Sequence, residues 1–385
     1  MKKTLAAVAV LGAFAGSALA ADVQLYGIVD EGLAYSHVDL DGAADATDSF
    51  SMNSGMQSGS RFGFKGTEDL GNGLTVGFVL ENGFSADTGA DNDTFFDREA
   101  SLFLEGGFGK LAFGKIGSIN CGTSSWAQIG VLSAFGTSNW GGYSNQIGST
   151  ASTGGVMDNT IAYQTPTFAG FTVYAQYSMG DDGSKNEITG GVENESSIDR
   201  YYAIGAKYAN GPLTAYFAVD SVNYRTWAGT APVLGADDID DSLTVTLGGN
   251  YDFDVVQVFF GAQYFDEVKT FGSLVSNSDM HFASKIKGYG LNLSANIPVA
   301  GGKIMAGVGY VDAEAADSQT DAAFKDNEFQ RYIVSAGYDY PFSKRTDAYA
   351  VASYMQDSVD YGVAAGKEDR DPSAFTFVVG LRHKF

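Results

Sequence analysis

The sequence predicts an all-β protein, a 16-stranded antiparallel transmembrane β-barrel with short turns at one end and long loops at the other. Segments of about ten residues alternate between apolar and polar side chains, as transmembrane strands do. Glycine and aromatic residues are abundant, with 50 Gly, 27 Phe and 21 Tyr, whereas there are only 6 Pro. Mean hydropathy is close to zero, at −0.06. A soluble β-sandwich could share this composition, so the prediction depends on the alternation.

Residues 1–20 are set apart from the barrel. Lys2 and Lys3 precede an apolar run from Leu5 to Ala15, and Ala18-Leu19-Ala20 follows it. This is the pattern of a secretory signal peptide that is cut after Ala20. The apolar run is too short to cross a bilayer as a helix, which takes about 20 residues. We therefore expect residues 21–385 to form one exported domain without a membrane helix.

Charge and cysteine content exclude several classes of protein. The net charge is −23, which argues against nucleic acid as a partner because binding phosphates requires a basic surface. A single cysteine cannot form an internal disulfide. His37, His281 and His383 are scattered and have neither metal-ligand spacing nor an evident serine partner. We expect no metal, no cofactor and no catalytic site.

Alternation with period two is clearest in two segments. Between Leu74 and Phe84, the residues Leu, Val, Phe and Leu share one face, whereas Thr, Gly, Val and Glu share the other. In the last strand Phe375, Phe377, Val379 and Leu381 oppose Thr376, Val378, Gly380 and Arg382. One face suits hydrocarbon and the other suits water, as in the wall of a membrane barrel.

The connections between these segments also alternate. Seven short turns are expected near residues 70–73, 106–109, 166–170, 210–212, 253–254, 298–302 and 341–344. Eight longer loops, rich in Gly and Asp, are expected around residues 36–57, 85–94, 116–157, 180–199, 223–241, 266–282, 312–328 and 357–372. These connections join sixteen strands and place both termini on the short-turn side. A closed, even-numbered barrel satisfies every backbone group of an antiparallel sheet in lipid. The acids of the long loops are interpreted as solubilising groups, with binding of divalent cations beside lipopolysaccharide as the alternative.

The third long loop, residues 116–157, contains no Asp, Glu, Lys or Arg. It carries Trp126, Phe135, Trp140, Tyr143 and the only cysteine, Cys121. A loop this long inside a compact domain is uncommon unless it has a function. We expect it to line a pore, and we interpret Cys121 as a buried or idle thiol.

Several segments resemble the trimeric general porins of Gram-negative outer membranes. They are VQLYGIVD at 23–30, SRFGFKGTEDLG at 60–71, FVLENGF at 78–84, FGKLAFGK at 108–115 and GLRHKF at 380–385. The resemblance extends over the whole chain after residue 20, with variable loops. It implies a homotrimer in the outer membrane, with residues 116–157 folded inward as a constriction loop. It also implies that the terminal Phe385 is the signal to the outer-membrane assembly machinery.

Parity places candidate pore residues on the inner wall. Arg61 and Lys65 share a face opposite Phe62 and Phe64, and a cation on the lipid face near midplane would cost about 2 to 4 kcal/mol. Glu81 faces the lumen by the same argument. Arg98 matches a family arginine that joins the strand-two arginine in a basic ladder. However, Arg98 has the parity of Leu102 and Leu104, so a bulge or a protein-facing wall would be needed.

Two further positions follow from the resemblance. In the family, acids on the third loop face the basic ladder, but here Ser133-Ala134-Phe135-Gly136 has none. The nearest acids are Glu81 and Asp158, so we expect a steric constriction with a weak transverse field. Lys115 has outward parity and is expected to contact Asp87, Asp91 or Asp93 of a neighbouring subunit. A solvated strand end is the alternative for Lys115.

We therefore expect a passive, water-filled channel for ions and small hydrophilic solutes. Its selectivity would come from the bore left by the third loop and from the wall charges of Arg61, Lys65, Glu81 and Arg98. Such a protein is not an enzyme. The alternative is a solute-specific channel or surface receptor, in which Trp126, Trp140 and Tyr143 bind a ligand such as a sugar. Tyrosines near strand ends are interpreted as girdles at the membrane interfaces.

Overall fold

The computed structural model describes residues 23–42, 45–91, 94–137, 155–180, 199–224, 227–228, 231–232, 240–268, 285–318, 324–362 and 368–385. The predicted signal peptide, and Trp140 and Tyr143 of the third loop, lie outside these ranges. No helix within the described ranges is long and apolar enough to span a membrane.

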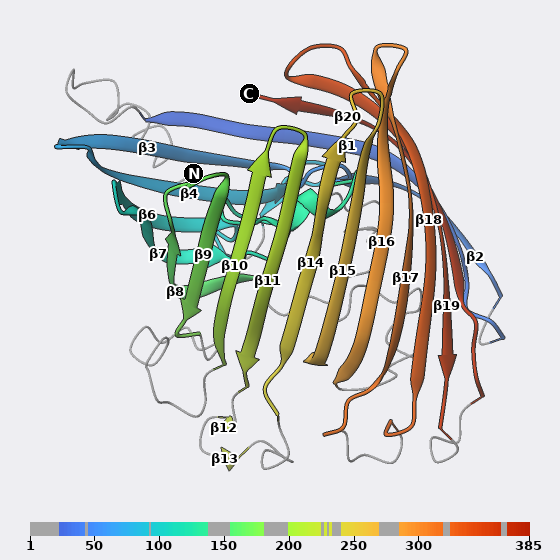
Figure 1. The fold of residues 1–385 in the computed structure, drawn as a ribbon. Helices are drawn as coiled ribbons and strands as arrows, with labels where there is room; N and C mark the ends of the chain where they lie inside the picture. The colour runs from blue at the N-terminus through green and yellow to red at the C-terminus, as the bar shows by residue number, and fades with distance from the viewer. Residues whose placement is uncertain are drawn as a thin grey trace, which may run out of the picture.

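Antiparallel strands make up nearly all of the described structure (Figure 1). The wall contains β1 (Gln24–Asp39), β2 (Thr47–Ser54), β3 (Arg61–Gly71), β4 (Leu74–Ser85), β6 (Glu99–Gly106), β7 (Gly109–Gly117), β8 (Val156–Gln164), β9 (Phe171–Ser178), β10 (Arg200–Asn210), β11 (Leu213–Asn223), β14 (Leu243–Asp252), β15 (Gln257–Val268), β16 (Ile286–Val299), β17 (Gly302–Ala315), β18 (Glu328–Pro341), β19 (Thr346–Asp360) and β20 (Ser373–Lys384). Short elements in the loops are β5 (Ala90–Asp91), β12 (Trp227–Ala228), β13 (Ala231–Pro232) and the 3₁₀ helix η1 (Ile129–Leu132).

The barrel closes where the first strand meets the last. β1 pairs with β20 from Ile28 opposite Lys384 to Asp39 opposite Ser373. On its other edge β1 pairs with both β3 and β2, first over 24–28 and then over 31–38. β2 and β3 thus share one place in the wall, which has 16 strand positions. The predicted strand number is confirmed, and the second wall strand is interrupted at residues 55–60.

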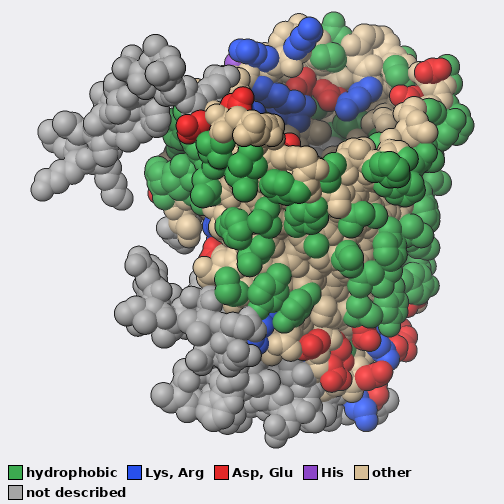
Figure 2. All heavy atoms as spheres, turned by 60° about the vertical axis from the view of Figure 1, so that its left-hand side comes forward, with side chains coloured by type: hydrophobic (Ala, Val, Ile, Leu, Met, Phe, Trp, Pro, Cys, Tyr) green, Lys and Arg blue, Asp and Glu red, His purple; other side chains and the backbone are tan. Residues whose placement is uncertain are grey.

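Side chains alternate between the two faces of the wall as predicted. On β20, Phe375, Phe377 and Leu381 are 37%, 41% and 52% exposed, whereas Thr376 and Val378 are 1% and 0% exposed. Figure 2 shows apolar side chains over the outer surface, and charged side chains of both signs at its two ends, with Lys and Arg together with some Asp and Glu around the hollow at the top. The exposed apolar face is the one that lipid covers in a membrane barrel.

Several strands extend further than the sequence predicted. The first loop was expected at 36–57, but β1 runs to Asp39 and β2 begins at Thr47. Its Ser, Thr and Asp residues favour a loop by type, yet the ladder pairs them, and the Tyr35 hydroxyl donates to Asp48 Oδ1 at 2.6 Å. The eighth loop is also shorter than expected, because β19 continues to Asp360.

Candidate pore constriction

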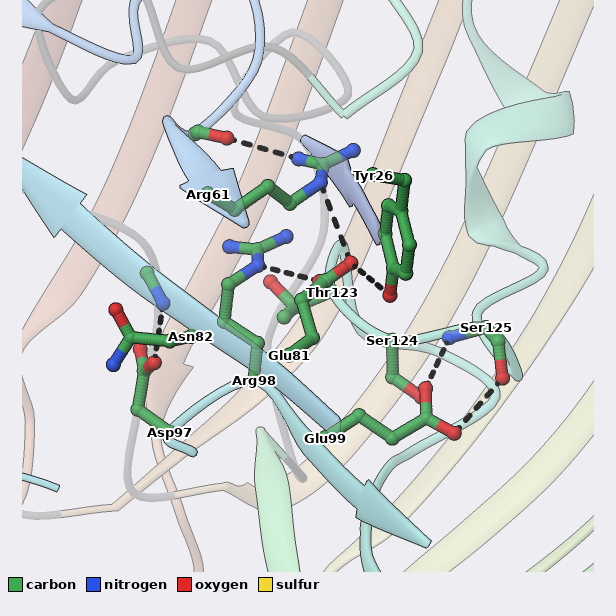
Figure 3. Close-up of polar contacts among 12 residues, drawn as sticks. Tyr26, Arg61, Glu81, Asn82, Asp97, Arg98, Glu99, Thr123, Ser124 and Ser125 are labelled. Atoms are coloured by element: carbon green, nitrogen blue, oxygen red, sulfur yellow. Dashed lines mark hydrogen bonds and ion pairs between the residues drawn. The ribbon is translucent and has the colours of Figure 1, made fainter. Parts of the chain in front are cut away.

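A charged cluster of Arg61, Glu81 and Arg98 lies on the inner wall (Figure 3). Arg98 Nε is 2.7 Å from Glu81 Oε1, and Arg61 Nε is 3.6 Å from Glu81 Oε2. The Tyr26 hydroxyl donates to Glu81 Oε2 at 2.9 Å. Glu81 is opposite Gly63 in the β3–β4 register, so the inward parity predicted for Arg61 and Glu81 brings both side chains to one point.

Arg98 reaches this cluster because it precedes its strand. The β4–β6 ladder begins with Glu81 opposite Glu99, so Arg98 lies just outside the alternation of β6. Its backbone N–H donates to the carbonyl of Glu81 at 3.3 Å, and Asp97 Oδ1 accepts from the Gly83 N–H at 2.6 Å. Arg98 can therefore join the cluster without a bulge in β6, although it has the same parity as Leu102 and Leu104.

The cluster holds two guanidinium groups and one carboxylate. The side chains of Arg61, Arg98 and Glu81 are 24%, 15% and 11% exposed, so all three are partly open to solution. Arg61 Nη1 also donates to the carbonyl of Gly59 at 3.0 Å. One positive charge is left uncompensated in this cluster.

Lys65 lies nearby on the same wall. Its side chain is exposed, and its Nζ is 5.1 Å from the centre of the Tyr26 ring. A cation at this distance from an aromatic face is weakly attracted by the ring. Lys65 therefore keeps its charge exposed, and its role in the pore stays a prediction.

Two further lysines were not singled out from the sequence. Lys110 Nζ lies 4.0 Å from the Phe103 ring centre and 5.2 Å from that of Trp126. Lys207 Nζ is 3.3 Å from Gln128 Oε1. Among the described residues, neither Nζ atom lies within 4 Å of a carboxylate oxygen. The signal for Lys110 was its parity, which is opposite to that of the outward Leu111 and Phe113 in the same segment.

The third loop, as far as residue 137, lies against inward-facing wall residues. Close to β9, the Ile119 N–H donates to Gln176 Oε1 at 2.9 Å. Further along, Asn250 Nδ2 of β14 donates to the carbonyl of Val131 at 2.9 Å, and the Ala134 N–H donates to Ser294 Oγ of β16 at 3.0 Å. The described segment therefore passes along the interior from β9 to β16, and its role as a constriction loop stays a prediction.

Trp126 and Phe135 are packing residues of this loop. Both are 2% exposed. Trp126 belongs to a cluster with Ile116 and Ile129, and Phe135 to one with Met305 and Met355 on the opposite wall. Phe135 sits within the acid-free 133–136 segment. Trp126 is therefore not displayed to a solute, which removes one of the three aromatic residues proposed for a ligand site.

Lys115 and Phe385 have contacts within the chain. Lys115 Nζ is 2.6 Å from Asp158 Oδ1, beside the register shift between Gly114 and Ile116. Asp158 thus compensates Lys115, and the acid that joins the arginines is Glu81. Phe385 exchanges backbone hydrogen bonds with Gly27 at 3.0 and 3.1 Å and is 44% exposed. The subunit contact of Lys115 and the assembly role of Phe385 stay predictions.

Comparison with known proteins identifies the family. A family model described as Gram-negative porin matches residues 6–360. The chain belongs to this family. The porin is 33% identical over 420 residues to an outer membrane porin protein of Bordetella pertussis, with 100% of both chains covered. It is 29% identical over 396 residues to outer membrane porin protein 32 of Delftia acidovorans, again with 100% of both covered.

A solved structure agrees with these matches. The anion-selective porin from Comamonas acidovorans aligns with a TM-score of 0.63 and 25% identity, over 95% of this chain and 100% of that one. The protein is thus an outer-membrane porin, a channel of a family whose members are channels rather than enzymes. Within the described residues, no three His, Cys, Asp or Glu side chains are grouped so as to hold a metal ion.

Proposed function

We propose that this porin passes ions and small hydrophilic solutes passively, and that its constriction gives a modest preference for anions. One observation carries the proposal: the single carboxylate of Glu81 is shared by Arg61 and Arg98, and residues 116–157 supply no acid. The net positive charge of this cluster favours anions in a pore.

The neighbouring lysines also favour anions over cations. Lys65, Lys110 and Lys207 contact rings or an amide rather than carboxylates. The overall net charge of −23 has the opposite sign, and much of it resides in the long loops. At physiological ionic strength exposed charges are screened beyond about 8 Å, so the charges at the constriction dominate the selectivity. The anion-selective porin that aligns over 95% of this chain supports the same direction.

Ion selectivity of the purified wild-type protein tests this proposal. In a planar bilayer with a tenfold KCl gradient, we expect stepwise conductance and a reversal potential on the anion side of zero. A reversal potential on the cation side would contradict the anion preference while leaving the channel intact. Absence of conductance in correctly assembled protein would contradict the channel itself.

We further propose that the porin functions as a homotrimer beside lipopolysaccharide. The relatives over the full length of the chain are outer-membrane porins, and the resemblance of their motifs implies three subunits. Light scattering of the detergent-solubilised protein measures the mass of the assembly. A mass of one chain, in protein that retains its β-structure, would contradict the trimer.

Lys115 remains a proposed subunit contact. It must exchange or share its partner Asp158 to bind an acid of a neighbouring second loop. Lys115→Ala should therefore lower the temperature at which the oligomer dissociates by more than Asp158→Ala does. An equal effect of both substitutions would show that the pair acts only within one subunit.

A further inference from the structure

The uncharged third loop contacts a buried carboxylate near its start. Glu99 is the first residue of β6 and is 1% exposed. It faces the lumen, because it is opposite Glu81 in the ladder and shares the parity of Ser101. The loop residues Ser124 and Ser125 lie over it (Figure 3).

Both oxygens of Glu99 accept two hydrogen bonds each. Oε1 accepts from Ser101 Oγ at 2.7 Å and from Ser125 Oγ at 3.0 Å. Oε2 accepts from the Ser125 N–H at 2.8 Å and from Ser124 Oγ at 3.1 Å. Three of these four donors belong to the loop.

We propose that Glu99 is a positioning residue of the constriction, whose ionised carboxylate holds the start of the third loop against the wall and so sets the bore. The proposal deepens the channel function stated above and rests on it. Only an ionised carboxylate presents two oxygens that accept without donating. A glutamine at this position would keep one oxygen and turn two N–H donors toward donors of the loop.

The same logic explains why the loop can lack charged residues. A second buried wall carboxylate, Asp220, accepts from Asn120 of the loop. The hydroxyl of Tyr216 donates to Asn120 Oδ1 at 2.8 Å. The wall thus supplies the acids and the loop supplies neutral donors. Loss of Glu99 alone leaves the attachment at Asn120, so the expected change is local to residues 121–128.

Cys121 lies between the two attachment points and serves as a built-in reporter. It is the only cysteine of the chain and is 7% exposed. Its Sγ–H donates to the carbonyl of Thr123 at 2.6 Å. Burial raises the pKa of the Cys121 thiol to about 11, which keeps the reactive thiolate scarce at neutral pH. Loosening of residues 121–128 should make this thiol reactive.

The experiment compares three variants with the wild type in assembled, detergent-solubilised protein. Glu99→Gln removes the charge from the wall. The double variant Ser124→Ala with Ser125→Ala removes two loop donors and leaves Glu99 in place. Glu105→Gln is the matched control, because Glu105 lies on the same strand with inward parity and is exposed. For each protein we measure the rate at which a small methanethiosulfonate reagent modifies Cys121 and the temperature at which the oligomer dissociates. The single-channel current is measured after insertion of the same protein into a planar bilayer.

We expect Glu99→Gln and the serine double variant to raise the modification rate several-fold and to give larger, noisier currents. Glu105→Gln should shift the reversal potential by loss of a charge and leave the modification rate unchanged. An unchanged rate and current in both Glu99→Gln and the serine variant would overturn the proposal. A lower dissociation temperature without faster modification would also overturn it, since Glu99 would then only stabilise the barrel. If the wild type forms no channel, the channel function fails, and the thiol rates still test the attachment of the loop.

Discussion

Glu81 Oε1 lies 2.7 Å from Arg98 Nε, and the second oxygen of the same carboxylate lies 3.6 Å from Arg61 Nε. The two arginines are therefore not an independent ladder of charges. They are coupled through one acid, and the field in the lumen depends on the sum of all three. Selectivity should respond to this sum rather than to either arginine alone.

Glu81→Gln tests this coupling from the acidic side. It raises the charge of the cluster by one unit and leaves the two guanidinium groups facing each other, so the anion preference should increase. The reversal potential in a KCl gradient measures it, with Glu105→Gln as a control for loss of an acid elsewhere in the lumen. An equal shift in both variants would show that Glu81 has no special position.

Removal of the arginines tests the coupling from the basic side. Arg98→Ser leaves Glu81 paired with Arg61, a neutral cluster, whereas the double variant Arg61→Ser with Arg98→Ser leaves a lone carboxylate. We expect a stepwise shift of the reversal potential toward cations, largest in the double variant. If the double variant shifts no further than Arg98→Ser, Arg61 does not contribute to the filter.

The wall was predictable from sequence because the bilayer imposes a strict rule on it. Lipid tolerates neither an unpaired backbone group nor a cation at midplane, so alternation fixed the faces of Arg61 and Lys65 and the strand number followed from the turns. This rule gives a weaker signal where few apolar residues mark the outer face. Residues 36–39 and 47–54 are mostly polar, and the pairing between β1 and β2 makes them strand.

The interior of the pore was less predictable, because it depends on contacts between distant segments. Glu99 stands beside Arg98 in the sequence, but its role arises from Ser124 and Ser125, about 25 residues later. Lys110 was visible by parity, yet nothing in the sequence placed Trp126 beside it. Residues of a long loop carry no periodic signal that indicates which wall residues they meet.

A buried ion pair on the inner wall provides a prediction about stability. Arg331 of β18 and Asp357 of β19 are 1% and 0% exposed, and they form two parallel bonds of 2.7 and 2.9 Å. Asp357→Asn leaves a buried guanidinium without its counter-charge, which typically costs about 3 to 5 kcal/mol. We expect a clear fall in the thermal unfolding temperature of the barrel.

The matched control replaces both partners. Arg331→Met with Asp357→Leu removes both charges together, and such replacements are often neutral or stabilising. The double variant should therefore be more stable than Asp357→Asn alone. If the double variant is less stable than the single one, the pair contributes through contacts other than its mutual charge.

The terminal residue allows folding and assembly to be separated. Phe385 extends the β1–β20 pairing by two backbone hydrogen bonds with Gly27, which any residue except Pro can make. Its ring lies over Gly27, where an added Cβ would be only 2.3 Å from the ring, but the ring itself forms no part of the ladder. Phe385→Ser should therefore refold in detergent as the wild type does, as measured by the β-sheet signal in circular dichroism.

In cells the same variant should accumulate poorly in the outer membrane if the assembly machinery reads the terminal ring. Phe377→Ser is the control, because Phe377 is on the same outer face of β20 and is 41% exposed, close to the 44% of Phe385. Quantification of each protein in the outer-membrane fraction measures the effect. Equal amounts of the two variants would assign Phe385 no role beyond that of an ordinary lipid-facing phenylalanine.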